Sequence, residues 1–318
     1  STLSSSSAAS DVYKRQKVKS AKYSSGSSKR STSSRNAEPM VLRGRIQTKD
    51  ADQLKVMRRA GLVVAEGLTA MTAAAKPGVT TRELDQTACE VLARNGATSN
   101  FLNYGADWGI APYPANVCTS VNNVVVHGIP NDQPLKAGDI ISIDFGAIVD
   151  GWHGDAARTV IVGGSGAEED SRLDAATEAA MWAGVAAAWT GHRIGDISNA
   201  IEQVADSAGF EIVAEFTGHG IGTEMHMAPD VPNFGRPGRG AKLSYGMTIC
   251  IEPILTTGSP ECATLADDWT VVTVDGSRAA HWENSVAITR DGLWILTEPD
   301  GGEAKLTELG VPFAPLAD

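Results

Sequence analysis

Apolar residues recur at helical spacing in two stretches of the first half of the chain. In residues 50–75 they fall three or four positions apart, and the stretch ends at Lys-Pro-Gly in positions 76–78. The second stretch opens with Thr-Thr-Arg-Glu at 80–83, a capping-box pattern, and closes at Asn-Gly in positions 95–96. Capping boxes start helices, while proline and glycine end them, so this pattern predicts two consecutive helices.

The second half of the chain repeats this plan. A helix is predicted from about residue 169 to 189, followed by a glycine and a second helix that starts near residue 196. Five pairs of like residues stand at one offset of 113 positions: Gly78 and Gly191, Glu83 and Asp196, Leu84 and Ile197, Val91 and Val204, Gly96 and Gly209. Strand-like sequence follows each helix pair, so we expect an α+β protein of two similar halves that arose by internal duplication.

A hairpin is predicted between the two helix pairs. Residues 138–146 alternate between apolar and polar positions, Asp150-Gly151 is a strong two-residue turn signal, and residues 153–162 are typical of the return strand. Pairing across that turn places Asp144 and Asp155 diagonally on one face of the hairpin, with Cβ atoms roughly 7–8 Å apart.

Two carboxylates at this separation are suited to binding cations. Paired metal ions in proteins sit about 3.5–4 Å apart, so they fit between Asp144 and Asp155. The alternative is a pair of solvated aspartates near a turn. The apolar neighbours of Asp144 disfavour that alternative, because a buried carboxylate needs a partner and the opposing strand has no cation in register before Arg158.

Acidic residues also stand at the ends of two further apolar stretches. Glu252 follows residues 248–251, and Glu283 precedes residues 284–288. A single glutamate at a strand end is most often a surface residue. Together with the two aspartates and the glycine-framed His219, however, these residues suit an oxygen-rich dinuclear metal site with one imidazole. The chain contains no GxSxG, P-loop, HExxH or complete GxGxxG sequence that would favour a rival chemistry.

The sequence TGHGIGTEMH at 217–226 contains two of the six histidines. Its glycines favour strand or loop over helix. Seven residues separate His219 from His226, and an odd separation sends two side chains to opposite faces of a continuous strand. The two histidines can share a site only if the chain turns between them, which favours one metal ligand and one residue that positions the substrate.

Composition and charge narrow the classes of function. The net charge is −11 although residues 1–39 hold eight Lys or Arg side chains, so the rest of the chain is strongly acidic. Such a chain repels phosphate, which argues against a nucleic-acid partner. No apolar run approaches the ~20 residues of a membrane span, and the four cysteines include no CxxC pair. Residues 1–39, rich in serine, are expected to be a disordered extension, either transit-like or artefactual, ahead of a folded domain at 40–318.

From about Met40 to Glu298 the chain resembles the type I methionine aminopeptidases, enzymes of the pita-bread (creatinase/aminopeptidase) fold. The resemblance rests on motifs that follow one another along the chain: CTSVN at 118–122, HGIP at 127–130, IDF at 143–145, GD at 154–155, GHGIG at 218–222, His226, IEP at 251–253 and Glu283. It implies an α+β fold of two pseudo-symmetric halves with antiparallel sheet and flanking helices. Residues 40–318 would be the catalytic domain.

The resemblance also implies a role for each candidate residue. The ligands of two divalent metals (Co, Mn, Fe or Zn) would be Asp144, Asp155, His219, Glu252 and Glu283. Asp155 and Glu283 would bridge the metals, which would activate a bridging water, and Glu252 would accept its proton. His127 and His226 would hydrogen-bond the scissile amide and stabilise the tetrahedral intermediate.

A methionine pocket is implied as well. Its lining would be Tyr113, Cys118, His127, Met225, His226 and Trp269. Ile110 and Met225 stand where the family often has aromatic residues, so we expect retained methionine preference with altered affinity. The implied substrates are nascent chains that begin with methionine followed by a small residue. The implied protein is a cytoplasmic monomer that can associate with ribosomes and has no membrane or nucleic-acid partner.

Two other functions fit parts of this pattern. An Xaa-Pro peptidase of the same fold usually carries a sizeable extra N-terminal domain, and residues 1–39 are too polar to form one. A pita-bread binding module typically lacks the metal ligands, whereas all five stand in this chain. The predicted activity is therefore metal-dependent hydrolysis of the N-terminal methionine.

Overall fold

The computed structural model describes residues 44–316, so the extension predicted at 1–39 lies outside the described residues. The helices are α2 (Ala51–Ala74), α3 (Thr81–Arg94), α4 (Glu168–Ala186), α5 (Ile194–Ala208) and α6 (Glu303–Glu308). The strands are β1 (Thr98–Ser99), β2 (Val117–Val121), β3 (Val124–Val126), β4 (Ile140–Val149), β5 (Trp152–Ile161), β6 (Glu211–Ile212), β7 (Gly218–Gly220), β8 (Met227–Val231), β9 (Thr248–Ile251), β10 (Ile254–Thr256), β11 (Cys262–Thr264), β12 (Val271–Thr273), β13 (Ala279–His281), β14 (Asn284–Ile288) and β15 (Leu293–Ile295).

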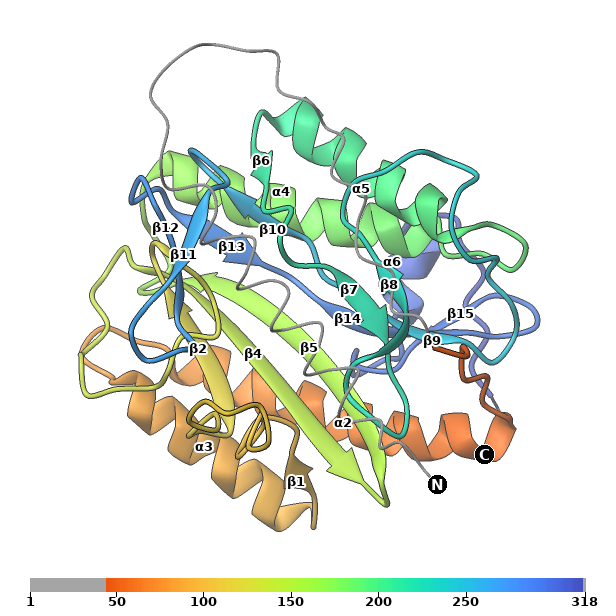
Figure 1. The fold of residues 1–318 in the computed structure, drawn as a ribbon, viewed down its shortest axis with the longest axis horizontal. Helices are drawn as coiled ribbons and strands as arrows, with labels where there is room; N and C mark the ends of the chain where they lie inside the picture. The colour runs from red at the N-terminus through yellow and green to blue at the C-terminus, as the bar shows by residue number, and fades with distance from the viewer. Residues whose placement is uncertain (1–43, 317–318) are drawn as a thin grey trace.

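Two helix pairs enclose the strands from opposite sides (Figure 1). The helices α2 and α3 bury their apolar faces against β4, through a core that includes Leu68, Leu84 and Phe145. The helices α4 and α5 do the same against β9 and β14, with Ile201 and Ile251 in the core. The predicted α+β architecture is confirmed, and each half has its own core beneath its own helix pair.

The hairpin of β4 and β5 has the predicted register. Val149 pairs with Trp152, Gly146 pairs with Asp155, and Asp144 pairs with Ala157. The turn residue Asp150 adopts a positive φ of 48°, as the two central positions of a tight hairpin turn require. The turn alone therefore determines which residues of the two strands share a face.

The second large sheet contacts this hairpin at Asp155 and Ala157 of β5. Its strand order is β15-β14-β9-β7-β8, with all pairs antiparallel. An isolated bridge joins Ala157 of β5 to Glu283, the residue before β14, through backbone hydrogen bonds of 3.0 and 3.3 Å. This contact brings the carboxylates of the hairpin next to those of the second sheet.

The internal repeat is visible in the backbone at the ends of the helices. Gly78 and Gly191 have φ values of 93° and 95°, and the N–H of each donates to a leucine carbonyl. Gly96 and Gly209, at the C-terminal ends of α3 and α5, also have positive φ values, of 60° and 79°. Glycine is the residue that reaches this left-handed region without steric cost. The 113-residue offset therefore relates two copies of one helix–turn–helix geometry.

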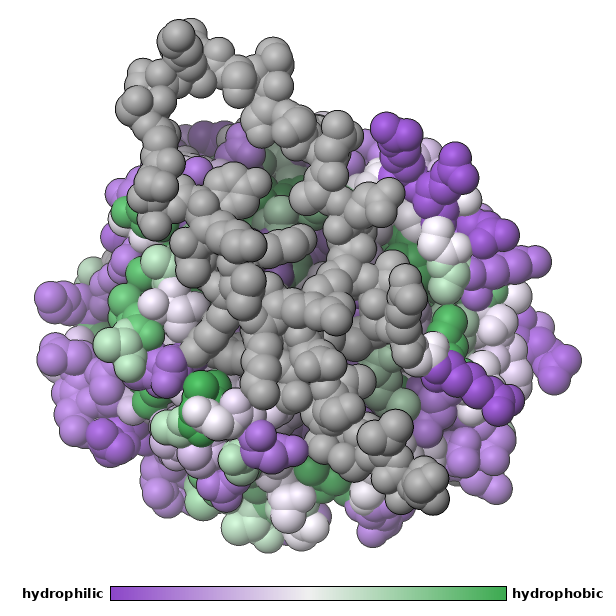
Figure 2. Space-filling model, in the orientation of Figure 1, coloured by the Kyte–Doolittle hydropathy of each residue, from purple (hydrophilic) through white to green (hydrophobic). Residues whose placement is uncertain are grey.

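The described surface is mixed in polarity. Figure 2 shows hydrophilic residues along its visible rim, with hydrophobic ones interspersed among them. The large apolar side chains that are exposed lie singly along the chain, for example Leu62, Leu265 and Leu309. Among the described helices, none combines the length and apolar character needed to cross a bilayer.

Candidate active site

All the residues that the sequence predicted for the site line one pocket. Its walls include parts of β4, β5 and β7 and the segments that flank β9 and β14. The predicted residues in this lining are Tyr113, Cys118, His127, Asp144, Asp155, His219, Met225, His226, Glu252, Trp269 and Glu283.

Three carboxylates meet at the base of the hairpin. Oxygen atoms of Asp144, Asp155 and Glu283 lie within 4.8 Å of one another. Asp155 and Glu283 are buried, with 3% and 2% of their surface exposed. One oxygen of each of the three carboxylates has no hydrogen-bond partner among residues 44–316. Buried acceptors without donors are costly, so this arrangement calls for a positively charged partner.

The electrostatics of the site point the same way. Burial raises the pKa of Asp144 to about 7. Burial, followed by the negative charge of neighbouring carboxylates, raises the pKa of Asp155, Glu252 and Glu283 well above their ordinary range. Four carboxyl groups so close together cannot all ionise without added positive charge. Divalent cations supply that charge, and they prefer carboxylate oxygen and imidazole nitrogen as ligands, so these residues fit a metal centre.

Arg158, the cation nearest in register, forms its ion pair with Glu298 and not with these carboxylates. It pairs with Ile143, the residue next to Asp144, so its side chain belongs to the other face of the hairpin. Its guanidinium donates to the Glu298 carboxylate at 2.6 Å and to the backbone carbonyl of Glu283 at 2.6 Å. Arg158 therefore holds the backbone of Glu283 in place and leaves its carboxylate free to face the pocket.

The two histidines of the glycine-rich stretch converge on the pocket from a strand and a turn. His219 lies in β7, and His226 directly precedes β8, so the chain reverses direction between them. The ring centroids are 4.4 Å apart. Nδ1 of His219 donates to the carbonyl of Gly220, so Nε2, which lies 3.4 Å from Glu252, is the ring nitrogen that can accept. Burial lowers the pKa of His219 to about 4, so the ring is neutral, as a metal ligand must be.

The hydroxyl of Tyr104 holds the second histidine. It lies 2.5 Å from Nδ1 of His226, and the two rings meet edge to face at 5.5 Å. Burial is the main cause that lowers the pKa of His226 well below its usual range. When Nδ1 accepts the hydrogen bond from the Tyr104 hydroxyl, Nε2 carries the hydrogen that the ring can donate.

The glycines beside His219 are required by close backbone approach. A Cβ atom on Gly218 would lie 2.4 Å from the carbonyl oxygen of Cys250, and one on Gly220 would lie 2.3 Å from that of Ala228. We expect Gly220→Ala to lower the free energy of unfolding by about 1–3 kcal/mol, because neighbouring strands must move apart. Urea unfolding measures this, with Gly44→Ala as the control, since its Cβ makes only ordinary contact. Equal stability of the two variants would contradict the prediction.

An aromatic pocket adjoins the carboxylates. Trp269 packs against Trp108 with ring centroids 5.9 Å apart and against Tyr113 at 5.3 Å. The hydroxyl of Tyr113 donates to the carbonyls of Val117 and Gly128, and Nε1 of Trp269 donates to the carbonyl of Ala111. The cavity wall is therefore apolar and suits a long, unbranched side chain such as methionine.

Two of the rings in this wall could not be read from the sequence. Tyr104 and Trp108 line the pocket, whereas Ile110 packs behind it as a partly buried residue. Both rings come from an irregular segment of successive turns, where no periodicity indicates which side chains point inward. Tyr104 and Trp108 thus supply the aromatic surface that Ile110 and Met225 do not provide.

His127 occupies a strained position at the edge of the pocket. It has a φ of 58°, which is uncommon for a residue other than glycine and is often found at functional sites. Its ring meets Phe216 and Trp269 edge to face, and its buried Nδ1 lacks a hydrogen-bond partner within the described part of the chain. Burial lowers its pKa to about 4, so His127 faces the pocket as a neutral imidazole.

Sequence reasoning missed a further group of lining residues, namely Phe101, Val126, Phe216, Asp230 and His281. His281 ends β13, and its Nε2 lies 3.8 Å from Glu252. The strand pattern around Glu283 placed His281 on the same face two residues earlier, so that alternation was the available signal.

Comparisons with known proteins agree with this geometry. The sequence model of metallopeptidase family M24 matches residues 55–290. Methionine aminopeptidase 1 of Mycobacterium tuberculosis is 48% identical over 265 residues, which cover 80% of this chain and 97% of that protein. The methionine aminopeptidase of Clostridium perfringens is 46% identical over 249 residues, covering 78% and 97%. The crystal structure of methionine aminopeptidase from Thermotoga maritima matches with a TM-score of 0.77 at 37% identity, covering 80% of this chain and 100% of that one.

The chain therefore belongs to metallopeptidase family M24 and, within it, to the methionine aminopeptidases. The predicted pita-bread fold is confirmed, as is the predicted class of enzyme, a metal-dependent aminopeptidase.

Proposed function

We propose that this protein removes the N-terminal methionine of nascent chains whose second residue is small, using two divalent cations in the pocket. The observation that carries the proposal is the meeting of unpartnered, buried carboxylate oxygens with an apolar aromatic wall in one cavity. Such a cavity can hold a cation at the reacting bond and an apolar side chain beside it. The relatives named methionine aminopeptidase support the same substrate.

Five residues would hold the cations, and they are Asp144, Asp155, His219, Glu252 and Glu283. Asp155 and Glu283, the most deeply buried of the four site carboxylates, are suited to bridge two ions. Divalent cations bound there would acidify a water molecule and polarise the scissile carbonyl. Oxygen-rich ligands with one imidazole accept Co, Mn, Fe or Zn, and supply in the cell selects among them.

Three residues would handle protons and the reacting amide. Glu252 borders the metal ligands and is suited to accept the proton of the attacking water, since its buried carboxyl has a raised pKa. His127 and His226 are neutral rings that can each donate one hydrogen bond to the substrate amide. Tyr104 fixes the orientation of His226 through the bond to Nδ1.

The apolar wall would bind the methionine side chain. Tyr113, Cys118, Met225 and Trp269 line it, together with the rings of Tyr104 and Trp108. A thioether packs favourably against aromatic rings and sulfur atoms, so methionine gains more there than a shorter side chain does.

The proposal includes the setting of the reaction. Residues 40–318 act as the catalytic domain, since the family match at 55–290 lies within them. A substrate that is a nascent chain implies a cytoplasmic enzyme that meets its substrate at the ribosome. We expect it to act as a monomer, because the pocket is built from a single chain.

A Met-Ala-Ser peptide tests this function directly. Protein loaded with Mn(II) or Co(II) should release free methionine, and chelation should abolish the release until metal is returned. Amino-acid chromatography measures the product. Metal-loaded protein that releases no methionine would refute the proposal, and cleavage of Ala-Pro but not Met-Ala peptides would indicate an Xaa-Pro peptidase instead.

A further inference from the structure

A buried thiol lies beside the proposed metal ligands and has no part in the reaction described above. Cys250 stands in the middle of β9, with none of its surface exposed. In the sheet order, β9 lies between β14 and β7, so its side chains face neighbours from both sides. Cys250 pairs with Ser285 of β14, and the two side chains approach within 3.5 Å.

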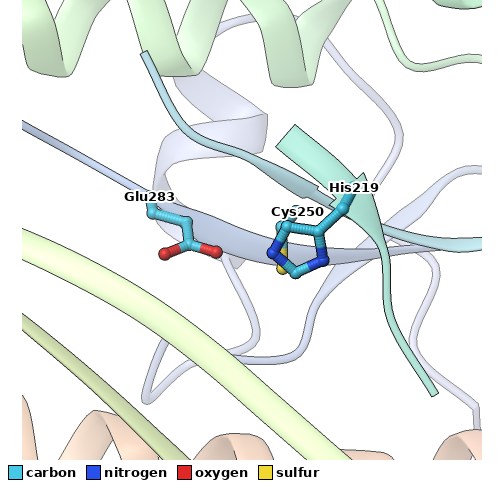
Figure 3. A group of neighbouring side chains, drawn as sticks. All are labelled: His219, Cys250 and Glu283. Atoms are coloured by element: carbon cyan, nitrogen blue, oxygen red, sulfur yellow. The ribbon is translucent and has the colours of Figure 1, made fainter. Parts of the chain in front are cut away.

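The sulfur atom belongs to a compact group of potential ligands. A ring nitrogen of His219, Sγ of Cys250 and a carboxylate oxygen of Glu283 lie within 4.8 Å of one another. Figure 3 shows the imidazole beside the sulfur, with the carboxylate of Glu283 turned toward both. Oε1 of Glu283 points to a ligand at this group as well, because Glu283 is 98% buried and this oxygen lacks a hydrogen-bond partner in the region 44–316.

Apolar side chains shield the sulfur on its other side. Cys250 packs in a cluster with Leu54 and Met57 of α2 and with Ile221, Trp294 and others. Water has little access from that direction. His219 and Glu283, the two partners of the sulfur in this group, line the pocket, so a cation can reach the group from there.

We propose that His219, Cys250 and Glu283 form a second, sulfur-containing binding site for a thiophilic divalent cation such as zinc or cadmium. The proposal rests on the proposed function only in taking His219 and Glu283 as ligands. Thiolate sulfur selects zinc and its heavier relatives, whereas carboxylate-rich sites suit harder ions such as manganese. Because two residues are shared, a cation bound to Cys250 withdraws them from the oxygen-rich arrangement and inhibits the enzyme.

The geometry requires only small adjustments. Zinc binds sulfur at about 2.3 Å and nitrogen or oxygen at about 2.0–2.2 Å, which places neighbouring ligand atoms roughly 3.5 Å apart. The ligand atoms are now up to 4.8 Å apart. Side-chain rotations that move these atoms by about an ångström would bring them to the spacing that zinc requires. On binding, the S–H bond breaks, a sulfur–metal bond forms, and the proton leaves to solvent.

Cadmium alone is the probe, because a thiolate bound to cadmium absorbs in the near ultraviolet. The parent protein is Cys89→Ser, which removes the exposed cysteine. Titration with cadmium should produce the absorption band at one equivalent, and Cys250→Ser should abolish it. The matched control Cys262→Ser removes a buried thiol that belongs to neither group of potential ligands among the described residues, and it should retain the band.

Inhibition gives the second measurement. Cadmium should inhibit methionine release by the manganese-loaded parent. Cys250→Ser should raise the cadmium concentration needed for inhibition by about tenfold or more, since the loss of a residue that merely supports a metal ligand already lowers metal affinity by that factor. If the serine variant folds poorly, Cys250→Thr takes its place, because threonine suits a strand.

Three results would overturn the proposal: cadmium bound by the parent without the band, a band that persists in Cys250→Ser, or equal inhibition of the two proteins. Failure of the proposed function would look different, because manganese-loaded parent would then release no methionine whether or not the band forms.

Discussion

Replacement of Asp155 by asparagine should remove most of the bound metal and lower turnover by roughly 10³-fold. Asparagine matches aspartate in size but lacks the charge that offsets a divalent cation. A metal centre contributes several kcal/mol to the stabilisation of a transition state, which sets the expected loss in rate. Metal analysis after dialysis and methionine release from Met-Ala-Ser measure the two effects.

The same variant should make the metal-free protein more stable. Burial and the charges of Glu283 and Asp144 raise the pKa of Asp155 in the folded state well above its unfolded value. A carboxyl group with a raised folded pKa weakens folding as pH rises above the unfolded pKa near 4, so at pH 7 its neutral replacement relieves that cost. The thermal midpoint without metal should rise, and the further rise on adding manganese should disappear.

Asp150→Asn is the matched control for this experiment. Asp150 lies at the turn of the same hairpin and is exposed, with its carboxylate paired to Arg59 at 2.6 Å. Exposed pairs contribute at most about 1 kcal/mol, so metal content and turnover should stay near those of the parent. Full metal content in Asp155→Asn would contradict its assignment as a ligand.

His127→Ala should lower turnover by about 10²–10³-fold while metal content stays unchanged. The loss corresponds to removal of one hydrogen bond to a developing oxyanion or amide. His127 is buried at the pocket edge and is absent from both groups of potential metal ligands among the described residues. Stopped assays with Met-Ala-Ser give the rate, and metal analysis of the same sample gives the occupancy.

Two comparisons sharpen the test of His127. His219→Ala should lose metal as well as activity, so the pair of variants separates a ligand from a substrate-binding residue. His192→Ala, at an exposed position between α4 and α5, should resemble the parent in both measurements. Loss of metal from His127→Ala would reverse the role proposed for it.

Local chemistry made part of this structure predictable. The Asp150-Gly151 turn specifies a two-residue hairpin, and a strand alternates strictly, so the positions of Asp144 and Asp155 follow from counting. The capping box at Thr80 and the paired glycines were predictable for the same reason, since each involves only residues a few positions apart in the chain. The odd spacing of His219 and His226 predicted that a shared site requires a turn, and the turn is present.

Contacts between distant segments were not predictable in this way. The bond from Tyr104 to His226 joins residues 122 positions apart, and Trp108 enters the pocket from a segment without periodicity. Cys250 looked like one thiol among four in the sequence, and only the order of β14, β9 and β7 brings it beside His219 and Glu283.

By itself, the sequence determined the helix boundaries to within a few residues, the hairpin register, the duplicated plan and, through its motifs, the set of candidate ligands. The tertiary structure decided which oxygens lack partners within the described residues, which rings form the apolar wall of the pocket, and that a thiol adjoins the carboxylates. Turns, caps and alternation act over a few covalent bonds, so they can be read along the chain. Convergence of side chains depends on how the sheets pair and how the cores pack, which only the folded arrangement contains.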